Sequence, residues 1–237
     1  GLHAFLLLRD PENRFHREAV KIALTIGAIF AILQPLSGDY AAKDVADRQP
    51  IKLAAMEGHF RTETSADLVI GGLPDEERQK VDYAIRIPGM LSYLAHGSFD
   101  AEVTGLEEFP REEWPPVLIT HVAFQIMVAA GMAMALVGVL FLLFRWRWPR
   151  LLSRRWWLWL VTAMTPLGFI AVEAGWTVTE VGRQPWIIYG IMKTKDAVTG
   201  MPGLQYTFYL FTGVYLLLTA VLIWLMYRQI ITVNSDQ

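Results

Sequence analysis

The sequence predicts an all-α protein, a polytopic bundle of transmembrane helices with a large external loop. Of 237 residues, 54% are hydrophobic and 19% are charged, and the mean hydropathy is +0.33. Soluble domains carry about 25% charged residues, so the chain has too little charge for that class. Four stretches are apolar enough to cross a bilayer, which takes roughly 20 helical residues. A single long polar region, 38–116, lies between the first and second of them.

Turn-forming residues bound the four expected spans. Pro35, followed by Ser37-Gly38-Asp39, is expected to end the first, and Trp114-Pro115-Pro116 precedes the second. Pro166 is expected to kink the third. The expected spans are 19–36, 117–144, 156–178 and 206–227.

The apolar N-terminal residues look like the tail of a fifth helix. Because the chain starts at Gly1 inside this run, we expect a natural N-terminal part to be missing. The chain then divides into four parts. Residues 1–8 are the end of a truncated helix, and 9–37 are an inner loop with a helix. Residues 38–116 form the external loop, and 117–237 form a group of three helices.

Charge is distributed unevenly between the linkers. Residues 9–21 hold four Lys or Arg, and 145–155 hold five with no acid, whereas 38–116 has 16 acidic against 8 basic residues. Lys and Arg in short loops mark the cytoplasmic side. We therefore expect both short linkers and the C-terminus inside and 38–116 outside. The net charge of −2 gives no basic stripe for nucleic acid, and the lipid bilayer is the expected surroundings.

Aromatic and sulfur residues limit the other roles. Cysteine is absent, so disulfides and thiolate ligands are excluded, and a metal or cofactor must rely on His, Met or carboxylate. Tryptophans crowd the inner boundary of two helices and are typical of an aromatic belt at the headgroup level. They are Trp146, Trp148, Trp156, Trp157 and Trp159.

Two carboxylates fall on one face of the third span. Glu173 and Glu180 are seven residues apart, and ionisable residues within spans are costly and usually functional. Glu180 can pair with Arg183 three residues later and simply close the helix. It can equally ligate a metal centre or carry protons, with Arg183 holding an anion such as a haem propionate. The residues alone leave both interpretations open.

The second span and the external loop hold further candidates. By residue type, His121 is favoured over Met127 as a metal ligand, because imidazole is the commoner one and Met in such a helix usually packs. In 48–57, Lys52 and Glu57 could flank one polar pocket of a short amphipathic helix. A solvated surface helix fits the same pattern. A quinol-oxidising site would need such a carboxylate as proton acceptor and a cation or amide to orient the ring.

Three blocks resemble subunit I of cytochrome bd-type quinol oxidases: GRQPW at 182–186, EAGW at 173–176 and KLAAMEG at 52–58. The resemblance covers nearly the whole chain, as the C-terminal half of that subunit, and extends to YAIRIP at 83–88 and VTGL at 103–106. It implies a terminal oxidase of the bacterial inner membrane that oxidises membrane quinol at the external loop and reduces oxygen to water. It also implies a second membrane subunit, a low-spin haem b, a high-spin haem b, and haem d or a third haem b.

The resemblance also implies roles for single residues. Lys52, Glu57 and Gln49 match quinol-binding positions, and Met127 matches the axial ligand of the low-spin haem b, which overrides the preference for His121. Glu180 matches the carboxylate ligand of the high-spin haem b. Trp176 and Arg183 match neighbours of the oxygen-reducing site with a catalytic role. Gln125 and Glu173 match residues that lie near a haem without bonding to its iron.

Two departures from the well-known members stand out. Gln125 replaces an Arg two residues before the ligating Met, which should alter the haem potential and resembles the cyanide-insensitive branch. The external loop resembles the short-loop class. The histidine ligands are expected in the missing N-terminal half.

Two alternatives belong to other classes. One is a haem-free helical transporter or channel that uses Glu173 and Glu180 as an ion relay, although transporters usually show repeats or paired broken helices. The other is a membrane anchor that carries one b-type haem and no oxygen chemistry.

Overall fold

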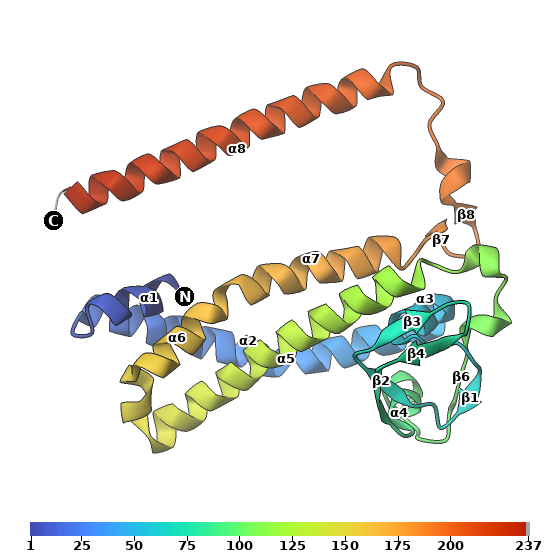
Figure 1. Ribbon diagram of the computed structural model, residues 1–237, viewed down its shortest axis with the longest axis horizontal. Helices are drawn as coiled ribbons and strands as arrows, with labels where there is room; N and C mark the ends of the chain where they lie inside the picture. The colour runs from blue at the N-terminus through green and yellow to red at the C-terminus, as the bar shows by residue number, and fades with distance from the viewer. Residues whose placement is uncertain (236–237) are drawn as a thin grey trace. The chain divides into compact units, whose positions relative to one another are not determined.

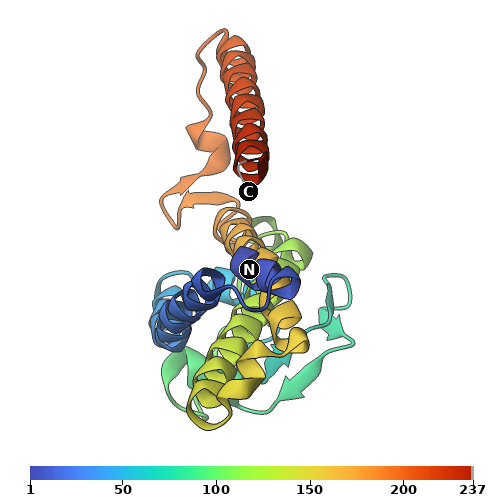
Figure 2. The same cartoon turned by 90° about the vertical axis from the view of Figure 1, so that its left-hand side faces the viewer.

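The computed structural model describes residues 1–235, with side chains up to Arg228. The chain forms two compact units, Gly1–Asp196 and Ala197–Gln237, which are treated separately. In the first unit, long helices lie side by side and short strands gather at one end of them (Figure 1). Figure 2 shows these helices nearly end-on.

The helices of the first unit share one apolar core. Ala28, Val137, Phe141 and Trp157 are buried together where four helices meet. These four are α1 (Leu2–Arg9), α2 (Arg14–Arg48), α5 (Val117–Arg147) and α6 (Arg155–Ala163), and α7 (Thr165–Val181) packs along α5. The apolar run at 1–8 is therefore helical, as expected.

Helices long and apolar enough to span a membrane number four in the described residues, which confirms the predicted polytopic helical bundle. They are Arg14–Arg48, Val117–Arg147, Arg155–Val181 and Leu204–Arg228. The last belongs to the second unit, within α8 (Leu204–Ser235), an almost entirely apolar helix.

Helix α2 does not end where the sequence suggested. It continues through Pro35 and ends only at Arg48, so the prediction of a stop at Pro35 is wrong. A proline inside a helix removes one hydrogen bond but does not prevent the next turns from forming. Those turns carry ion pairs at i,i+4 spacing, Lys43 to Asp39 at 2.6 Å and Arg48 to Asp44 at 2.8 Å.

The third predicted span is broken rather than gently kinked. Helix α6 ends at Ala163, and α7 begins at Thr165 with Pro166 in its first turn. Proline is tolerated there because the first N–H groups of a helix have no partner within it. The expected kink at Pro166 is therefore a break at Met164, with Pro166 in the first turn of the helix that follows.

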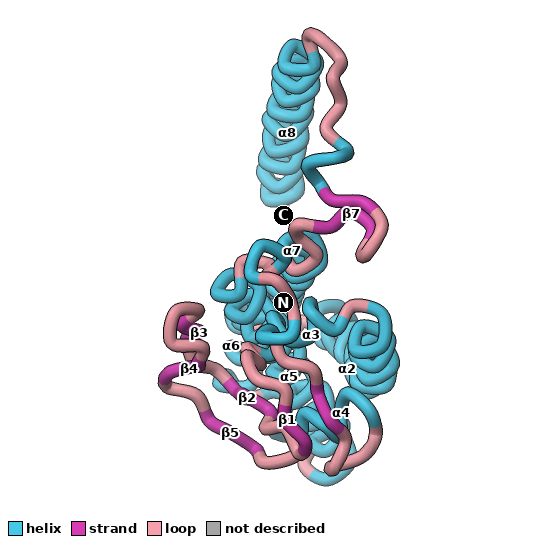
Figure 3. The backbone as a smooth tube through the Cα atoms, turned by 90° about the vertical axis from the view of Figure 1, so that its right-hand side faces the viewer, coloured by secondary structure: helices cyan, strands magenta, loops and turns pink. Residues whose placement is uncertain are grey.

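The segment between α2 and α5 folds into short elements that its composition did not predict (Figure 3). Its helices are α3 (Pro50–Glu57), α4 (Met90–His96), and the 3₁₀ turns Leu106–Glu108 and Arg111–Glu113. Its strands pair antiparallel. The pairs are β1 (Glu63–Thr64) with β6 (Glu102–Val103), β2 (Leu68–Ile70) with β5 (Ile85–Ile87), and β3 (Leu73–Asp75) with β4 (Lys80–Asp82).

Outside this segment, β7 (Trp186–Ile188) pairs with β8 (Met192–Lys193) after α7. Two further 3₁₀ turns are η3 (Pro149–Ser153) and η4 (Thr194–Ala197).

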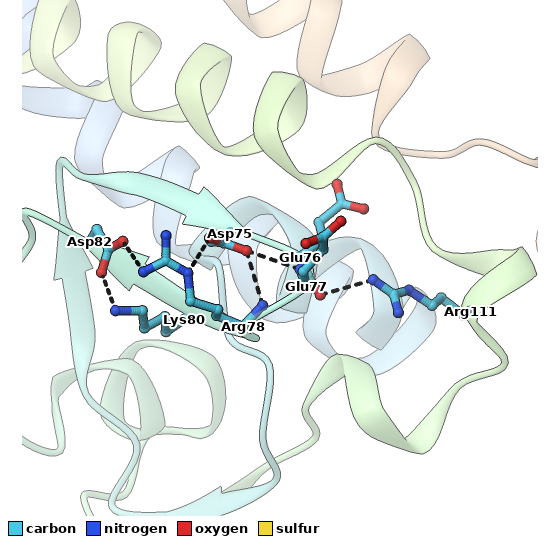
Figure 4. A network of polar contacts seen from close by, with 7 residues as sticks. All are labelled: Asp75, Glu76, Glu77, Arg78, Lys80, Asp82 and Arg111. Atoms are coloured by element: carbon cyan, nitrogen blue, oxygen red, sulfur yellow. Dashed lines mark hydrogen bonds and ion pairs between the residues drawn. The ribbon is translucent and has the colours of Figure 1, made fainter.

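Polar contacts join residues of the β3–β4 hairpin to one another and to Arg111, in the 3₁₀ turn before α5 (Figure 4). Asp75 accepts hydrogen bonds from the backbone amides of Glu77 and Arg78, and the Arg78 amide is the main reason that its pKa is lowered. Arg111 donates to the Glu76 carbonyl at 3.0 Å, and the Glu76 carboxylate accepts from the amide of Val117 at 3.1 Å. A carboxylate at a helix N-terminus is favourable, so this contact fixes where α5 begins.

The tryptophan cluster divides into two groups. Trp157 is fully buried in the helix core, so it is a core residue and not part of a belt. The others are exposed, as expected for a belt: Trp146, Trp148, Trp156 and Trp159.

Candidate functional site

Helix α3 is a buried helix at the junction of the folded segment with α2 and α5. Gln49 separates it from α2 and accepts a backbone hydrogen bond from Lys52 at 2.9 Å, while Pro50 occupies the first helical position. Every residue from Ile51 to Glu57 is buried. The alternative of a solvated surface helix is therefore excluded.

Glu57 is a buried carboxylate at the end of α3. Its side chain is 5% exposed, and its Oε2 atom has no hydrogen-bond partner among the residues that the structure describes. Burial raises the pKa of Glu57 to about 8, because the charged form loses its hydration. At neutral pH the group holds its proton, and it becomes a proton acceptor as the pH approaches 8.

Gly58 ends α3 in a conformation that suits glycine. Its φ is +64°, in the left-handed region. A Cβ atom there would lie 2.7 Å from Val81 Cγ2 and 3.3 Å from His121 Nδ1. The chain after Glu57 therefore runs directly against the ring of His121.

Lys52 lies at a small cavity between α3 and the end of α7. The cavity has a volume of about 100 Å³, and its lining includes Gln49, Lys52, Arg183, Trp186 and Tyr189. The pKa of Lys52 is lowered, first by burial and then by the Arg183 cation, an effect that Glu180 partly opposes. Two cations, an amide and two aromatic rings thus surround one space.

Lys52 and Glu57 do not share this cavity. Glu57 is not among its lining residues. Five helical positions of about 100° each separate the two side chains by about 140° around the axis of α3. Lys52 faces the end of α7, and Glu57 lies on a different face of the helix.

The end of α7 contains the ion pair that the sequence allowed. Arg183 Nη2 donates to Glu180 Oε1, and both side chains are partly exposed. Beyond them, the Nε1 group of Trp186 is buried with no acceptor in the described part of the chain, and Lys193 lies 4.7 Å above its ring. The ion pair closes the end of the helix, and it also leaves the Glu180 carboxylate accessible to a ligand, because both side chains are partly exposed.

The remaining acidic and aromatic candidates of α7 face outward. Ala174 and Val178 are buried toward the neighbouring helices, and Val178 packs with Met56 of α3. Glu173 and Trp176 are exposed, Trp176 at 63%. These two share with Glu180 the open side of α7.

Met127 is half-buried at the contact of α5 with α7. Its sulfur faces Gly175, where a Cβ atom would lie only 3.0 Å from it. The glycine therefore leaves room beside a soft donor atom. This thioether fits a donor type that haem iron accepts, and Glu180 presents a partly exposed carboxylate on the neighbouring helix.

His121 and Gln125 are engaged by backbone groups. His121 is fully buried, with Nδ1 2.9 Å from the Met56 carbonyl and Nε2 3.2 Å from the Gly71 carbonyl. The structure thus gives no support to the residue-type preference for His121 as a metal ligand, because both ring nitrogens face other groups. Gln125 bonds the backbone at Val69 and Gly71, contacts that the sequence did not predict.

The sequence also missed Tyr189 as a cavity residue, and found Trp186 only as part of the GRQPW block. The pKa of Tyr189 is raised, first by burial and then by the charge of Glu113. No local pattern marks Tyr189, since the β7–β8 hairpin brings it to the cavity.

Four helices long and apolar enough to span a membrane, and a buried carboxylate where the folded segment meets α2 and α5, define a multi-pass membrane protein with a polar site beside these two helices. Within that class, the family model for cytochrome bd terminal oxidase subunit I matches residues 1–233, and the chain belongs to this family. It is thereby a multi-pass protein of the bacterial membrane.

Named relatives agree with this family. A Bacillus subtilis protein named as a cytochrome bd menaquinol oxidase subunit I is 41% identical over 92% of this chain and 49% of its own length. Cytochrome bd ubiquinol oxidase subunit 1 of the same organism is 33% identical over 97% of this chain and 52% of its own. The solved bd oxidase of Geobacillus thermodenitrificans is similar at a TM-score of 0.82 and 37% identity, covering 96% of this chain and 53% of that one.

The chain spans about half the length of the curated relatives it matches. Family membership supports the predicted resemblance and disfavours the transporter and the single-haem anchor. The structural match likewise supports the predicted helical bundle.

Proposed function

We propose that this chain forms the quinol-oxidising and haem-binding part of a quinol:oxygen oxidoreductase. The observation that carries the proposal is Glu57, a buried carboxylate with an unpartnered oxygen and a pKa of about 8, at the junction of the folded segment with the spans. A general base is most effective when its pKa lies near the working pH.

Glu57 would accept the hydroxyl proton of the quinol. Oxidation of one quinol to quinone releases two protons and two electrons, so two quinols supply the four electrons that reduce one oxygen molecule to two water molecules. Lys52 and Gln49 would contribute to quinol binding from the cavity, on a different face of α3 from Glu57. The named relatives act on menaquinol or ubiquinol, so the chemical class of substrate is a membrane quinol.

The donor atoms of α5 and α7 would hold two haem groups. Met127 would ligate the iron of a low-spin haem b, and Glu180 would supply the carboxylate ligand of a high-spin haem b. The oxidase would also contain a third group, haem d or haem b. Bound haem groups supply one-electron transfer and the reduction of oxygen.

Other residues would support these ligands. The Arg183 cation at the cavity would hold an anionic group such as a propionate, because a guanidinium forms charge-assisted hydrogen bonds with a carboxylate. Trp176 and Glu173, exposed on the open side of α7, would lie beside the haem groups. Gln125, two residues before Met127 on α5, would influence the potential of the low-spin haem.

This arrangement would generate a membrane potential without a proton pump. With 38–116 outside, quinol protons leave on the outer side, and protons for water formation come from the inner side. The chain would work with a second membrane subunit and with haem-ligating histidines of subunit I beyond these 237 residues.

Substitution of Glu57 tests the proposal in the complete membrane complex. Glu57→Gln keeps the side-chain volume but cannot accept the proton, and we expect quinol oxidation to fall about 100-fold or more, with unchanged haem spectra. Glu77→Gln is the matched control, because Glu77 is an exposed carboxylate of the same segment. Normal quinol turnover in Glu57→Gln would refute the assignment.

A further inference from the structure

Two side chains of α5 hold the folded segment through its backbone. His121 and Gln125 are four residues apart, so they lie one turn apart on the same face of α5. His121 contacts the carbonyls of Met56 and Gly71, and Gln125 Nε2 donates to the Val69 carbonyl at 2.9 Å. The Gly71 amide donates to Gln125 Oε1 at 3.0 Å. We call these two side chains and their four contacts the α5 clasp.

The amide of Gln125 pairs with the backbone as a neighbouring strand would. It takes the carbonyl of Val69 in β2 and the amide of Gly71, which directly follows β2 where the chain bends with φ of +68°. Strand β2 pairs with β5 in a two-stranded sheet, which leaves its other edge open. Gln125 occupies that edge and needs both a donor and an acceptor to do so.

The ring of His121 joins two parts of the segment that lie far apart in sequence. One nitrogen faces the end of α3 at Met56, and the other faces Gly71, next to β2. A neutral imidazole donates from one nitrogen and an imidazolium from both. The ring is fully buried, and a Cβ on Gly58 would already crowd it at 3.3 Å.

The clasp lies between the two groups that the proposed function connects. Met56 directly precedes Glu57, and Met127 follows Gln125 by two residues on the same rigid helix. The position of the carboxylate relative to the thioether is therefore set by α5 and these four contacts, together with the packing of α3. A shift of the segment along α5 would change that relation.

From this geometry we infer that His121 and Gln125 are positioning residues for quinol oxidation. They hold Glu57 and the β2 edge in fixed register with the helix that carries Met127. The inference rests on the proposed function. It assigns to Gln125 the role of holding the folded segment, in addition to its place near the haem.

The test uses the complete oxidase in membranes and compares two electron donors. Gln125→Leu removes both bonds, and Gln125→Glu retains an acceptor but loses the donor. We expect both variants to lower kcat/KM for quinol about 10-fold to 100-fold. Oxygen consumption driven by tetramethylphenylenediamine, an artificial donor that does not require the quinol site, should fall much less than quinol-driven oxygen consumption. Gln34→Leu, on an exposed position of α2, is the matched control.

Hydrogen exchange gives a second measurement that does not depend on activity. Peptides covering 66–73 should exchange faster in Gln125→Leu than in the parent, because the Gly71 amide loses its acceptor. Unchanged quinol kcat/KM, or an equal loss with both donors, would overturn the inference. If Glu57→Gln abolishes quinol oxidation while Gln125→Leu does not affect it, the positioning role fails and the proposed function stands. If Glu57→Gln itself turns over normally, the proposed function fails.

Discussion

Burial of one carboxyl group determines how the proposed reaction should depend on pH. The pKa of Glu57 is raised to about 8 because its charged form is desolvated. Only the deprotonated form accepts a proton, so we expect kcat/KM for quinol to rise with pH and level off above about 8. The pH dependence of kcat/KM reports the pKa values of groups in the free enzyme. A profile measured from pH 6 to 9 that stays flat would contradict the role of Glu57 as base.

The same pKa shift has a consequence for stability with a defined sign. The folded-state pKa of Glu57 is above its ordinary value of 4.5, so its favourable contribution to stability is complete below that value and is lost as the pH rises through about 8. The Tm of the complex should therefore fall between pH 5 and 9. In Glu57→Gln this part of the fall should disappear, which thermal unfolding at several pH values would detect. An identical slope in both proteins would show that Glu57 is not the group responsible.

The thioether of Met127 leads to a spectroscopic prediction. Leucine has a similar volume but no donor atom, so Met127→Leu should convert the low-spin haem b to a high-spin form while packing is nearly maintained. Reduced-minus-oxidised spectra of membranes measure this directly. An unchanged low-spin band would remove Met127 from the ligand set.

Single residues show the limits of sequence reasoning most clearly. Residue type predicted Glu180 as a candidate, because ionisable residues within spans are costly, and the pattern of a short amphipathic helix predicted Lys52 and Glu57. It could not predict that Lys52 meets Arg183 across a cavity, since 131 positions of chain lie between them. Nor could it predict the partners of His121, which are backbone groups and have no side-chain signature.

At the scale of elements, the end of α3 offers a stability test with a matched pair of glycines. Gly58 has φ of +64° and no room for a Cβ, so Gly58→Ala should destabilise the protein by about 1–3 kcal/mol. Gly38 lies within α2 in open space, and Gly38→Ala should be neutral or stabilise by up to about 1 kcal/mol. Thermal unfolding compares the two. Equal effects would mean that the left-handed end of α3 carries no strain.

Helices were predictable as elements, and their ends only in part. The start of α5 after Pro116 followed from proline chemistry and is confirmed, whereas the kink expected at Pro166 is a break at Met164. The end of α2 did not, because ion pairs and the contact with α3 continue the helix beyond Pro35. The short strands of the folded segment escaped prediction, since two or three residues are too few to show alternation.

At the scale of the whole molecule, the polar groups of the first unit concentrate at one end of the spanning helices. The short strands, α3 and the start of α5 lie there together (Figure 1). The arginine-rich linker 145–155 follows the opposite end of α5. Lys and Arg in short loops mark the cytoplasmic side, so the buried carboxylate would face the outer compartment. Protons from quinol would then be released where they contribute to the membrane potential.

Cysteine labelling can test this orientation directly, because the chain contains no cysteine of its own. Ser98 is exposed in the folded segment and Ser153 is exposed in η3, at the arginine-rich linker. In intact cells, a membrane-impermeant maleimide should label Ser98→Cys and leave Ser153→Cys unlabelled until the membrane is opened. Haem spectra would verify that both variants assemble. Labelling of Ser153→Cys alone in intact cells would reverse the topology, and protons from Glu57 would then be released inside, where quinol oxidation could not contribute to the membrane potential.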